Sequence, residues 1–265
     1  MLFLKIVIVP IFISIVTLAG RKWGHKVAGV LAGFPVVAGP IIVFVALDQG
    51  VAFGQQAALA AINGTLALII FTITFCWACT RFHLAVSILI ATAAWFLVAI
   101  LIQIFPLSLM PAALLSSSVL ALTNFLLPKV GKLPPRNVHF NDMPWRMLIG
   151  ALLTIAITTL AVNLGPMWSG TLAVFPVISL VLAIFVYLGD GSGHVVEMYK
   201  GMLTGLYTFI AFFFTLACMW PAASIWEACL MAIPISLLVQ LTVQFLIKGK
   251  REVKRVNDKR RQAKS

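Results

Sequence analysis

Apolar runs of about twenty residues recur along almost the whole 265-residue chain, and short polar stretches separate them. An α-helix rises about 1.5 Å per residue, so a run of this length crosses a hydrocarbon core of about 30 Å. The polar stretches are too short to fold as soluble domains. The pattern predicts an all-α polytopic membrane protein with about nine spans, at residues 2–19, 26–47, 55–79, 82–104, 107–127, 146–164, 168–188, 196–219 and 224–247.

The first run lacks the features of a removable signal peptide. No basic region precedes its apolar residues, and no convincing small-residue cleavage site follows them. We therefore expect residues 2–19 to stay in the protein as its first span.

Composition agrees with the membrane class. The chain is 62% hydrophobic and 10% charged, and its mean hydropathy is +1.09. Soluble globular domains are only about 45–50% apolar. The composition therefore excludes an ordinary soluble enzyme or binding domain.

The net charge of +12 would suggest a nucleic-acid partner in a soluble protein, but here its distribution predicts topology. With nine spans and a cytoplasmic C-terminus, eighteen of the nineteen Lys and Arg residues lie inside, and only Lys5 lies outside. The basic tail at residues 248–265 has no aromatic residues among its bases, so we expect it to contact anionic headgroups and not nucleic acid.

The chain contains an ungapped internal repeat at an offset of 141 residues. The segment "AGVLAGFPVVAGPIIVFVALDQG" (28–50) aligns with "SGTLAVFPVISLVLAIFVYLGDG" (169–191). The matched pairs include Gly24/Gly165, Gly29/Gly170, Phe34/Phe175, Pro35/Pro176, Gly50/Gly191, Gly64/Gly205 and Gln103/Gln244. Chance similarity between apolar helices does not readily place Gly, Phe-Pro and Gln in one register.

The repeat predicts a 4+1+4 inverted topology. Residues 1–104 form repeat one, 105–145 a linking helix and cytoplasmic loop, 146–247 repeat two and 248–265 the basic tail. Because each repeat has four spans and one span separates them, the second repeat enters the membrane upside down. Such repeats are characteristic of secondary transporters, although channels and fused dimers also contain them.

Phe34-Pro35 and Phe175-Pro176 lie near the middle of the second and seventh predicted spans. Proline lacks the N–H donor of the helix ladder and clashes with the carbonyl four residues earlier, so we expect a kink at each position. Such breaks are tolerated in a membrane where they face protein or a cavity. Matched breaks favour a central site, and the alternative is tight packing through Gly29 and Gly33.

Polar residues beside paired glycines extend the candidate site. Asn63 precedes Gly64 in the third predicted span, and Thr204 precedes Gly205 in the eighth. They would bind a small polar solute if they met the broken helices, or hydrogen-bond a neighbouring helix if they did not. The predicted substrate-binding residues are Gly33, Phe34, Pro35, Asn63, Phe175, Pro176 and Thr204.

The sequence offers no catalytic or metal-binding pattern. The predicted spans carry no ionisable residue at depth, and we expect Asp190, His194, Glu197 and Lys200 to be solvated loop charges. Cys76 and Cys79, with His83 one turn later, have metal-ligand spacing, but no second ligand pair accompanies them. Phosphate-binding and hydrolase motifs are missing from the sequence. We predict neither an enzyme nor a cofactor.

The Phe-Pro motifs, each followed by a glycine-centred helix, resemble the GlpM-like family of small bacterial inner-membrane proteins. That family consists of single four-helix units, so this chain looks like two fused units with a linking helix. Val36 and Val177 stand where the family pattern leads us to expect Thr. The resemblance implies the cell inner membrane and a loose connection to exopolysaccharide production.

We therefore predict a secondary transporter or facilitator of a small solute, with a periplasmic N-terminus and a cytoplasmic C-terminus. Its expected partners are membrane lipid and the solute. The alternative is a non-transporting scaffold or assembly factor for an envelope or exopolysaccharide complex. A homodimer or a partner from such a complex would fit that alternative.

Overall fold

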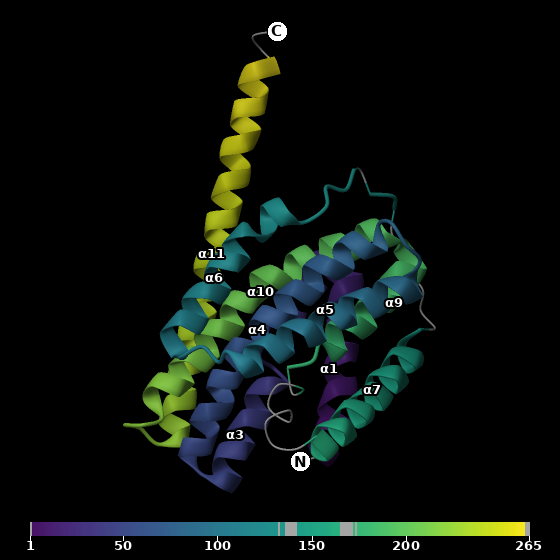
Figure 1. Cartoon of the computed structure of the whole chain (residues 1–265). Helices are drawn as coiled ribbons and strands as arrows, with labels where there is room; N and C mark the ends of the chain where they lie inside the picture. Colours follow the sequence, from purple (N-terminus) through teal and green to yellow (C-terminus); the bar gives the residue numbers. More distant parts are fainter. Residues whose placement is uncertain (1, 132, 136–141, 165–171, 173, 263–265) are drawn as a thin grey trace.

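The computed structural model describes residues 2–131, 133–135, 142–164, 172 and 174–262. These residues form ten helices and no strands. The helices are α1 Leu2–Trp23, α2 His25–Ala32, α3 Ala38–Gln49, α4 Val51–Cys79, α5 Leu84–Ile104, α6 Leu109–Leu126, α7 Met143–Leu164, α9 Val177–Asp190, α10 Ser192–Met219 and α11 Ile225–Gln262 (Figure 1).

Four helices of the described chain are long and apolar enough to cross a membrane: α4, α5, α10 and residues Ile225–Gly249 of α11. The shorter apolar helices include α3 and α9. The all-α prediction and the class of helical membrane protein are confirmed. The number of spans and their orientation stay predictions.

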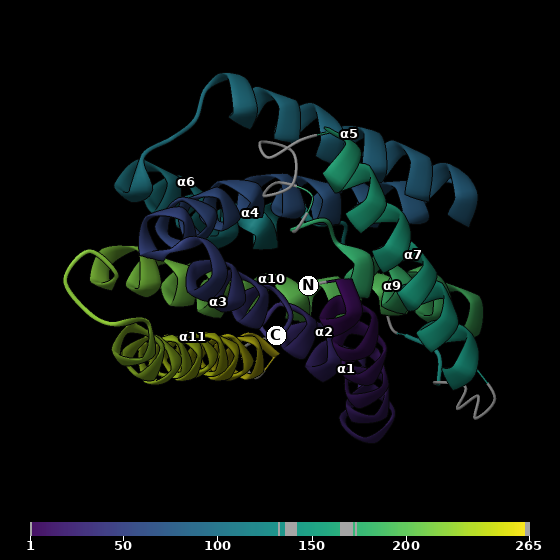
Figure 2. The same ribbon diagram turned by 90° about the horizontal axis from the view of Figure 1, so that it is seen from below.

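The central pair of helices is α4 and α10, which run antiparallel. Tyr199 near the start of α10 contacts the rings of Phe71 and Phe75 near the end of α4, with centroids 6.5 and 5.5 Å away. At the other end, Gln55 Nε2 of α4 donates to the Ala217 carbonyl of α10, 2.9 Å away. Figure 2 shows this pair between α5 and α6 on one side and α11 on the other.

The outer helices α5 and α11 expose large apolar side chains. Leu97 of α5 is 61% exposed and Phe245 of α11 is 76% exposed, whereas the central helices α4 and α10 are mostly buried. Apolar surface of this extent is stable against lipid but not against water. The arrangement is that of a helical bundle with a membrane-facing rim.

The second predicted span is interrupted, not merely kinked. Helix α2 ends at Ala32 and α3 begins at Ala38, so Gly33 to Val37 lie outside both helices. Proline explains the interruption because residue 35 has no N–H to donate to the Leu31 carbonyl. That carbonyl instead accepts the Phe34 N–H at 3.0 Å.

The same local structure occurs in the second half of the chain. Helix α9 begins at Val177 directly after Pro176, and the Leu172 carbonyl accepts the Phe175 N–H at 3.1 Å. The beginning of the seventh predicted span, residues 168–171 and 173, lies outside the described residues. The break predicted at Pro35 therefore interrupts a helix, and at the second predicted break α9 begins directly after Pro176.

Helix bounds recur at the 141-residue offset. Helices α1 (Leu2–Trp23) and α7 (Met143–Leu164) cover equivalent positions of the two halves. The 141-residue offset separates the first residues of α4 and α10 and the first residues of α5 and α11. It also separates the last residues of α3 and α9. Gly50 and Gly191, which join consecutive helices in the two halves, have φ angles of 93° and 87° that glycine adopts without strain.

Glycines bring the backbones of α2 and α10 into contact. A Cβ atom added at Gly29 would lie 1.8 Å from the Met198 carbonyl oxygen, and one at Gly205 would lie 2.3 Å from the Val30 carbonyl oxygen. Only glycine fits at such an approach. This contact fixes α2, and therefore the interrupted segment after it, against the core of the bundle.

Candidate functional site

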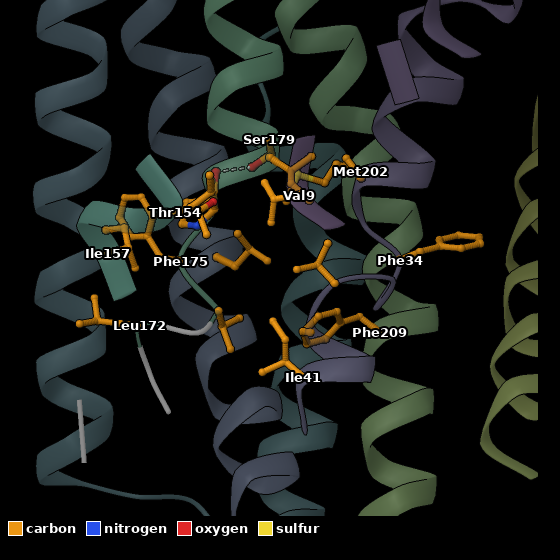
Figure 3. Close-up of a pocket in the computed structure, with 18 residues that line it drawn as sticks. Val9, Phe34, Ile41, Thr154, Ile157, Leu172, Phe175, Ser179, Met202 and Phe209 are labelled. Carbon is orange, nitrogen blue, oxygen red and sulfur yellow. Dashed lines mark hydrogen bonds between the residues drawn. The ribbon is translucent and has the colours of Figure 1, made fainter. Parts of the chain in front are cut away.

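A cavity lies between the two interrupted segments (Figure 3). The space open to the centre of a water molecule is about 110 Å³, well above the roughly 10–15 Å³ that one water needs. Its lining comes from α1, α2, α3, α4, α7, α9, α10 and the interrupted segments: Val9, Ala32, Phe34, Val37, Ala38, Ile41, Leu68, Thr154, Ile157, Leu172, Val174, Phe175, Pro176, Val177, Ile178, Ser179, Met202 and Phe209.

Counterpart residues of the two halves line this cavity together. Four pairs at the 141-residue offset belong to the lining: Phe34/Phe175, Val37/Ile178, Ala38/Ser179 and Leu68/Phe209. The cavity therefore contacts the same positions of each half and lies where the halves meet.

The lining is mostly apolar and contains two hydroxyl groups. Thr154 Oγ1 donates to the Gly150 carbonyl at 2.7 Å, and Ser179 Oγ donates to the Pro176 carbonyl at 3.2 Å. Among the described lining residues there is no Asp, Glu, Lys, Arg or His. Such a site can hold a small uncharged molecule, with the hydroxyls as its few polar contacts.

The two phenylalanines of the Phe-Pro motifs point outward from the cavity to opposite outer helices. The Phe175 ring packs against Trp95 and Phe96 of α5, with centroid distances of 5.1 and 6.4 Å. Figure 3 shows the Phe34 ring directed toward α11. Because α5 and α11 are themselves counterparts, each phenylalanine is directed toward the outer helix of the opposite half, and the Phe175 ring packs against that helix.

Three of the seven sequence-predicted site residues line the cavity: Phe34, Phe175 and Pro176. Gly33 and Pro35 belong to the interrupted segment without being part of the lining. A Cβ at Gly33 would lie 2.9 Å from Gly205 Cα, so this glycine faces α10.

Asn63 and Thr204 lie away from the cavity. The Asn63 amide accepts the Leu107 N–H at 3.3 Å and donates to the Leu107 carbonyl at 3.0 Å, which ties α4 to the α5–α6 connection. Thr204 Oγ1 donates to the Gly201 carbonyl of its own helix at 2.6 Å. Asn63 therefore links its helix to another segment of the chain, which is close to the predicted alternative of a bond to a neighbouring helix. Thr204 makes neither a bond to another helix nor a contact with this cavity.

Sequence reasoning missed four lining residues that shape the cavity. Leu68 and Phe209 are 141 positions apart, so the repeat register could have identified them as a pair. Thr154 and Ser179 have no hydroxyl counterparts at positions 13 and 38, which are Ile and Ala. No sequence signal distinguishes these two hydroxyls from others in apolar helices.

A charged cluster ties five helices together at one end of the bundle. Asp142 forms ion pairs with Arg21 and with Arg146, whose Nε lies 2.9 Å from Asp142 Oδ2. His25 Nε2 lies 2.7 Å from Asp190 Oδ2, and the His25 and His194 rings are 5.3 Å apart. These contacts join α1, α2, α7, α9 and α10.

The expectation of a solvated loop at residues 189–201 is wrong. Gly191 alone makes the turn between α9 and α10, so the other residues belong to those helices. The Asp190 side chain is 7% exposed, and His194 is covered by the Pro134 carbonyl, 3.0 Å from its Nε2. Glu197 remains substantially exposed, at 41%.

Asp142 is stabilised as a carboxylate by its two arginines. Burial alone would raise its pKa, but hydrogen bonds and charge interactions with Arg146 and Arg21 outweigh burial and lower the pKa below the ordinary value. The cluster is therefore an intact ionic contact at neutral pH.

Among the described residues no group of three or more His, Cys, Asp or Glu side chains could hold a metal ion. No protein-family model, curated protein or solved structure matches the chain. The geometry of the site is therefore the basis for assigning a function.

Proposed function

We propose that the protein is a secondary transporter or facilitator that carries a small uncharged solute through the cavity between its two halves. The observation that carries the proposal is the cavity itself, which is lined by counterpart residues of the two Phe-Pro segments. Interrupted helices at a repeat interface are how many transporters form a central site. The absence of charged side chains from the described lining favours an uncharged solute.

Packing between helices supports an inverted repeat as the basis of this function. The counterpart pairs α1–α7 and α4–α10 each pack together, and α4–α5 and α3–α4 have the counterpart contacts α10–α11 and α9–α10. Arg21 at the end of α1 pairs with Asp142 beside the start of α7, so these two helices run antiparallel. An antiparallel counterpart pair is what an axis in the membrane plane requires.

We place the protein in a bacterial inner membrane as a multi-pass protein with a periplasmic N-terminus. The start of α1 and the end of α11 lie at opposite ends of the bundle (Figure 1), as an odd number of crossings requires. The charged cluster then lies at the cytoplasmic end. In this conformation it would restrain that end, and breaking it would accompany opening toward the cytoplasm.

The alternative scaffold function is favoured by a different observation. The lining offers only two side-chain hydroxyls, and both already donate to backbone carbonyls. A cavity of this kind could be a packing defect in a protein that assembles with envelope proteins, as the GlpM-like resemblance suggests. Transport measurements distinguish the two functions.

The test is solute permeability in proteoliposomes. We expect the purified protein to accelerate osmotic swelling with one or more solutes of a neutral panel such as glycerol, urea and erythritol. Ala38→Leu and Ser179→Leu fill the cavity from counterpart positions and should each reduce the rate at least about tenfold. Leu97→Phe, at a lipid-exposed position of α5, is the matched control and should leave it unchanged.

Swelling at the rate of protein-free liposomes for every solute would contradict the transport proposal and favour the scaffold. Permeability that persists in both cavity-filled variants, with thermal stability like that of the wild type, would show that the solute takes another route.

A further inference from the structure

A second cavity lies on the other side of α10, in a groove between α6, α10 and α11. The space open to the centre of a water molecule is about 240 Å³. Apolar side chains form most of its wall, and four polar residues join them: Leu120, Ala121, Thr123, Leu127, Lys200, Leu203, Thr204, Tyr207, Val243, Leu246 and Ile247.

The polar residues of α10 form one face of the groove. Lys200, Thr204 and Tyr207 have the spacing of successive helical turns, so they lie above one another on α10. The Lys200 side chain is half-buried, and it makes no hydrogen bond or ion pair with the described residues. A lysine near the end of a membrane-spanning segment directs its ammonium toward the headgroup region.

The first half of the chain shows what occupies the equivalent place there. At the 141-residue offset, Thr204 corresponds to Asn63 and Tyr207 to Leu66 on α4. The chain turns back after α5, and Leu107 of the α5–α6 connection binds the Asn63 amide through its backbone N–H and carbonyl. The equivalent surface of α4 is therefore covered by a segment of the protein itself.

In the second half, no connecting segment of the described chain covers the equivalent surface of α10. Helix α11 continues without a turn to Gln262, so no connection folds back onto α10 (Figure 1). The Thr204 hydroxyl bonds only within its own helix. Lys200 replaces Leu59 of the first half, so the open groove has gained a positive charge that its covered counterpart lacks.

We propose that this groove binds an anionic phospholipid from the membrane leaflet at the Lys200 end. The lipid phosphate pairs with the Lys200 ammonium, and an acyl chain lies along the apolar walls of α6 and α11. Charge complementarity selects the phosphate, and the depth agrees because Lys200 lies only about two turns from the start of α10. Lys248, exposed on α11, adds positive charge near the groove wall formed by Leu246 and Ile247.

The test compares lipid retention by the full-length protein. After extraction in detergent, phosphatidylglycerol or phosphatidylcholine is added, and bound lipid is counted by native mass spectrometry. The wild type should retain phosphatidylglycerol about fivefold better, the factor expected for one base near the headgroup. Lys200→Gln should lose this preference, whereas Lys200→Arg should keep it. The matched control Lys22→Gln, which removes an exposed base of α1 outside the groove lining, should also keep it.

A second variant tests the groove without changing charge. Ala121 is exposed on α6 at the groove wall, so Ala121→Trp narrows the groove without entering the core and should also lower lipid retention about fivefold. Equal retention of the two lipids by the wild type, a preference that persists in Lys200→Gln, or undiminished lipid retention by Ala121→Trp would overturn the proposal.

Soluble glycerol phosphate tests the source of the phosphate. Glycerol phosphate should not raise the melting temperature of the protein at concentrations at which phosphatidylglycerol raises it. Equal stabilisation by the soluble phosphate would assign the groove to a soluble anion and overturn the lipid proposal. The inference is independent of solute transport, because retention is measured without any flux.

Discussion

Gly205 shows how little space separates α2 from α10 at the residue scale. An alanine Cβ there would lie 2.3 Å from the Val30 carbonyl oxygen and 3.1 Å from Gly33 Cα, and backbone atoms cannot swing aside as a flexible side chain can. We expect Gly205→Ala to destabilise the protein by about 1–3 kcal/mol, the usual cost of overpacking. Thermal unfolding in detergent would show a melting temperature lowered by several degrees.

Gly249→Ala is the control for this substitution. Gly249 is also helical, in α11, and nothing lies within 4 Å of a Cβ added there. Alanine favours a helix over glycine by about 1 kcal/mol, so stability should stay the same or rise slightly. Equal melting temperatures for both variants would contradict the close contact between α2 and α10.

Asp142 gives a pH-dependent prediction. Its pKa in the folded protein lies below the value of about 3.9 expected in an unfolded chain. The folded carboxylate therefore contributes stability above that unfolded value, and the contribution is lost as the pH falls through the lower folded pKa. Asp142→Asn should lower the melting temperature at pH 7, and the difference from the wild type should shrink below about pH 4.

The same measurement on Glu197→Gln provides the comparison, because that carboxylate is 41% exposed and lies 4.0 Å from His194. It should change the melting temperature little at any pH. A constant difference between Asp142→Asn and the wild type from pH 7 to pH 3 would show that the ion pairs with Arg21 and Arg146 do not stabilise the fold.

Helical phase explains why the sequence identified only part of the cavity lining. Asn63 and Leu68 lie on the same helix, but five residues turn an α-helix about 140° beyond a full turn. Leu68 therefore faces the cavity while Asn63 faces the α5–α6 connection. A polar residue in an apolar helix indicates a protein contact, but without its neighbours the sequence does not say which one.

At the scale of the element, Pro35 keeps α2 and α3 apart. Pro35→Ala restores an N–H that can donate to the Leu31 carbonyl and continue the helix. Since one hydrogen bond contributes about 1 kcal/mol, we expect the closed helix to lower solute permeability in proteoliposomes about fivefold. The folded protein should be at least as stable as the wild type.

Pro234→Ala is the matched control because Pro234 lies inside the continuous helix α11. It removes a proline from a membrane helix without closing an interruption, so permeability should not change. A Pro35→Ala protein that transports at the wild-type rate would argue that the interruption has no part in solute movement.

Proline chemistry made the break at Pro35 and the start of α9 after Pro176 predictable, because the missing N–H acts within one helical turn. The charged segment after α9 was not predictable in the same way. Its burial depends on the tight turn at Gly191 and on the Pro134 carbonyl, which is distant in sequence from His194. Local rules identified the breaks, whereas tertiary contacts decided which charges are solvated.

At the scale of the whole molecule, the inverted repeat predicts opposite sidedness for equivalent residues. Val51 and Ser192 are the first residues of α4 and α10, 141 positions apart. In a background with the exposed Cys218 and the half-buried Cys229 changed to Ser, Val51→Cys should react with a membrane-impermeant thiol reagent added to intact cells. Ser192→Cys should react only after the membrane is permeabilised.

Labelling of both cysteines from the same side would contradict an inverted repeat, whatever the number of spans. The sequence could suggest this symmetry because its glycines and prolines occupy special backbone positions in both halves. It could not show that the cavity and the lipid groove lie on different sides of α10. Those positions depend on how helices distant in sequence pack.

Because α11 is one continuous helix, a tilt of the part packed in the bundle also moves its far end. About fifteen residues continue beyond Ile247 to Gln262, which at 1.5 Å per residue is a rod of about 22 Å. Before this rod begins, α11 is held to α10 by the hydrogen bond from Thr208 to Gln240, 2.7 Å long. A tilt of α11 by about 10° would displace the tip of such a rod by about 4 Å. A small rearrangement of helices inside the bundle would therefore produce a larger displacement of the C-terminal end of α11.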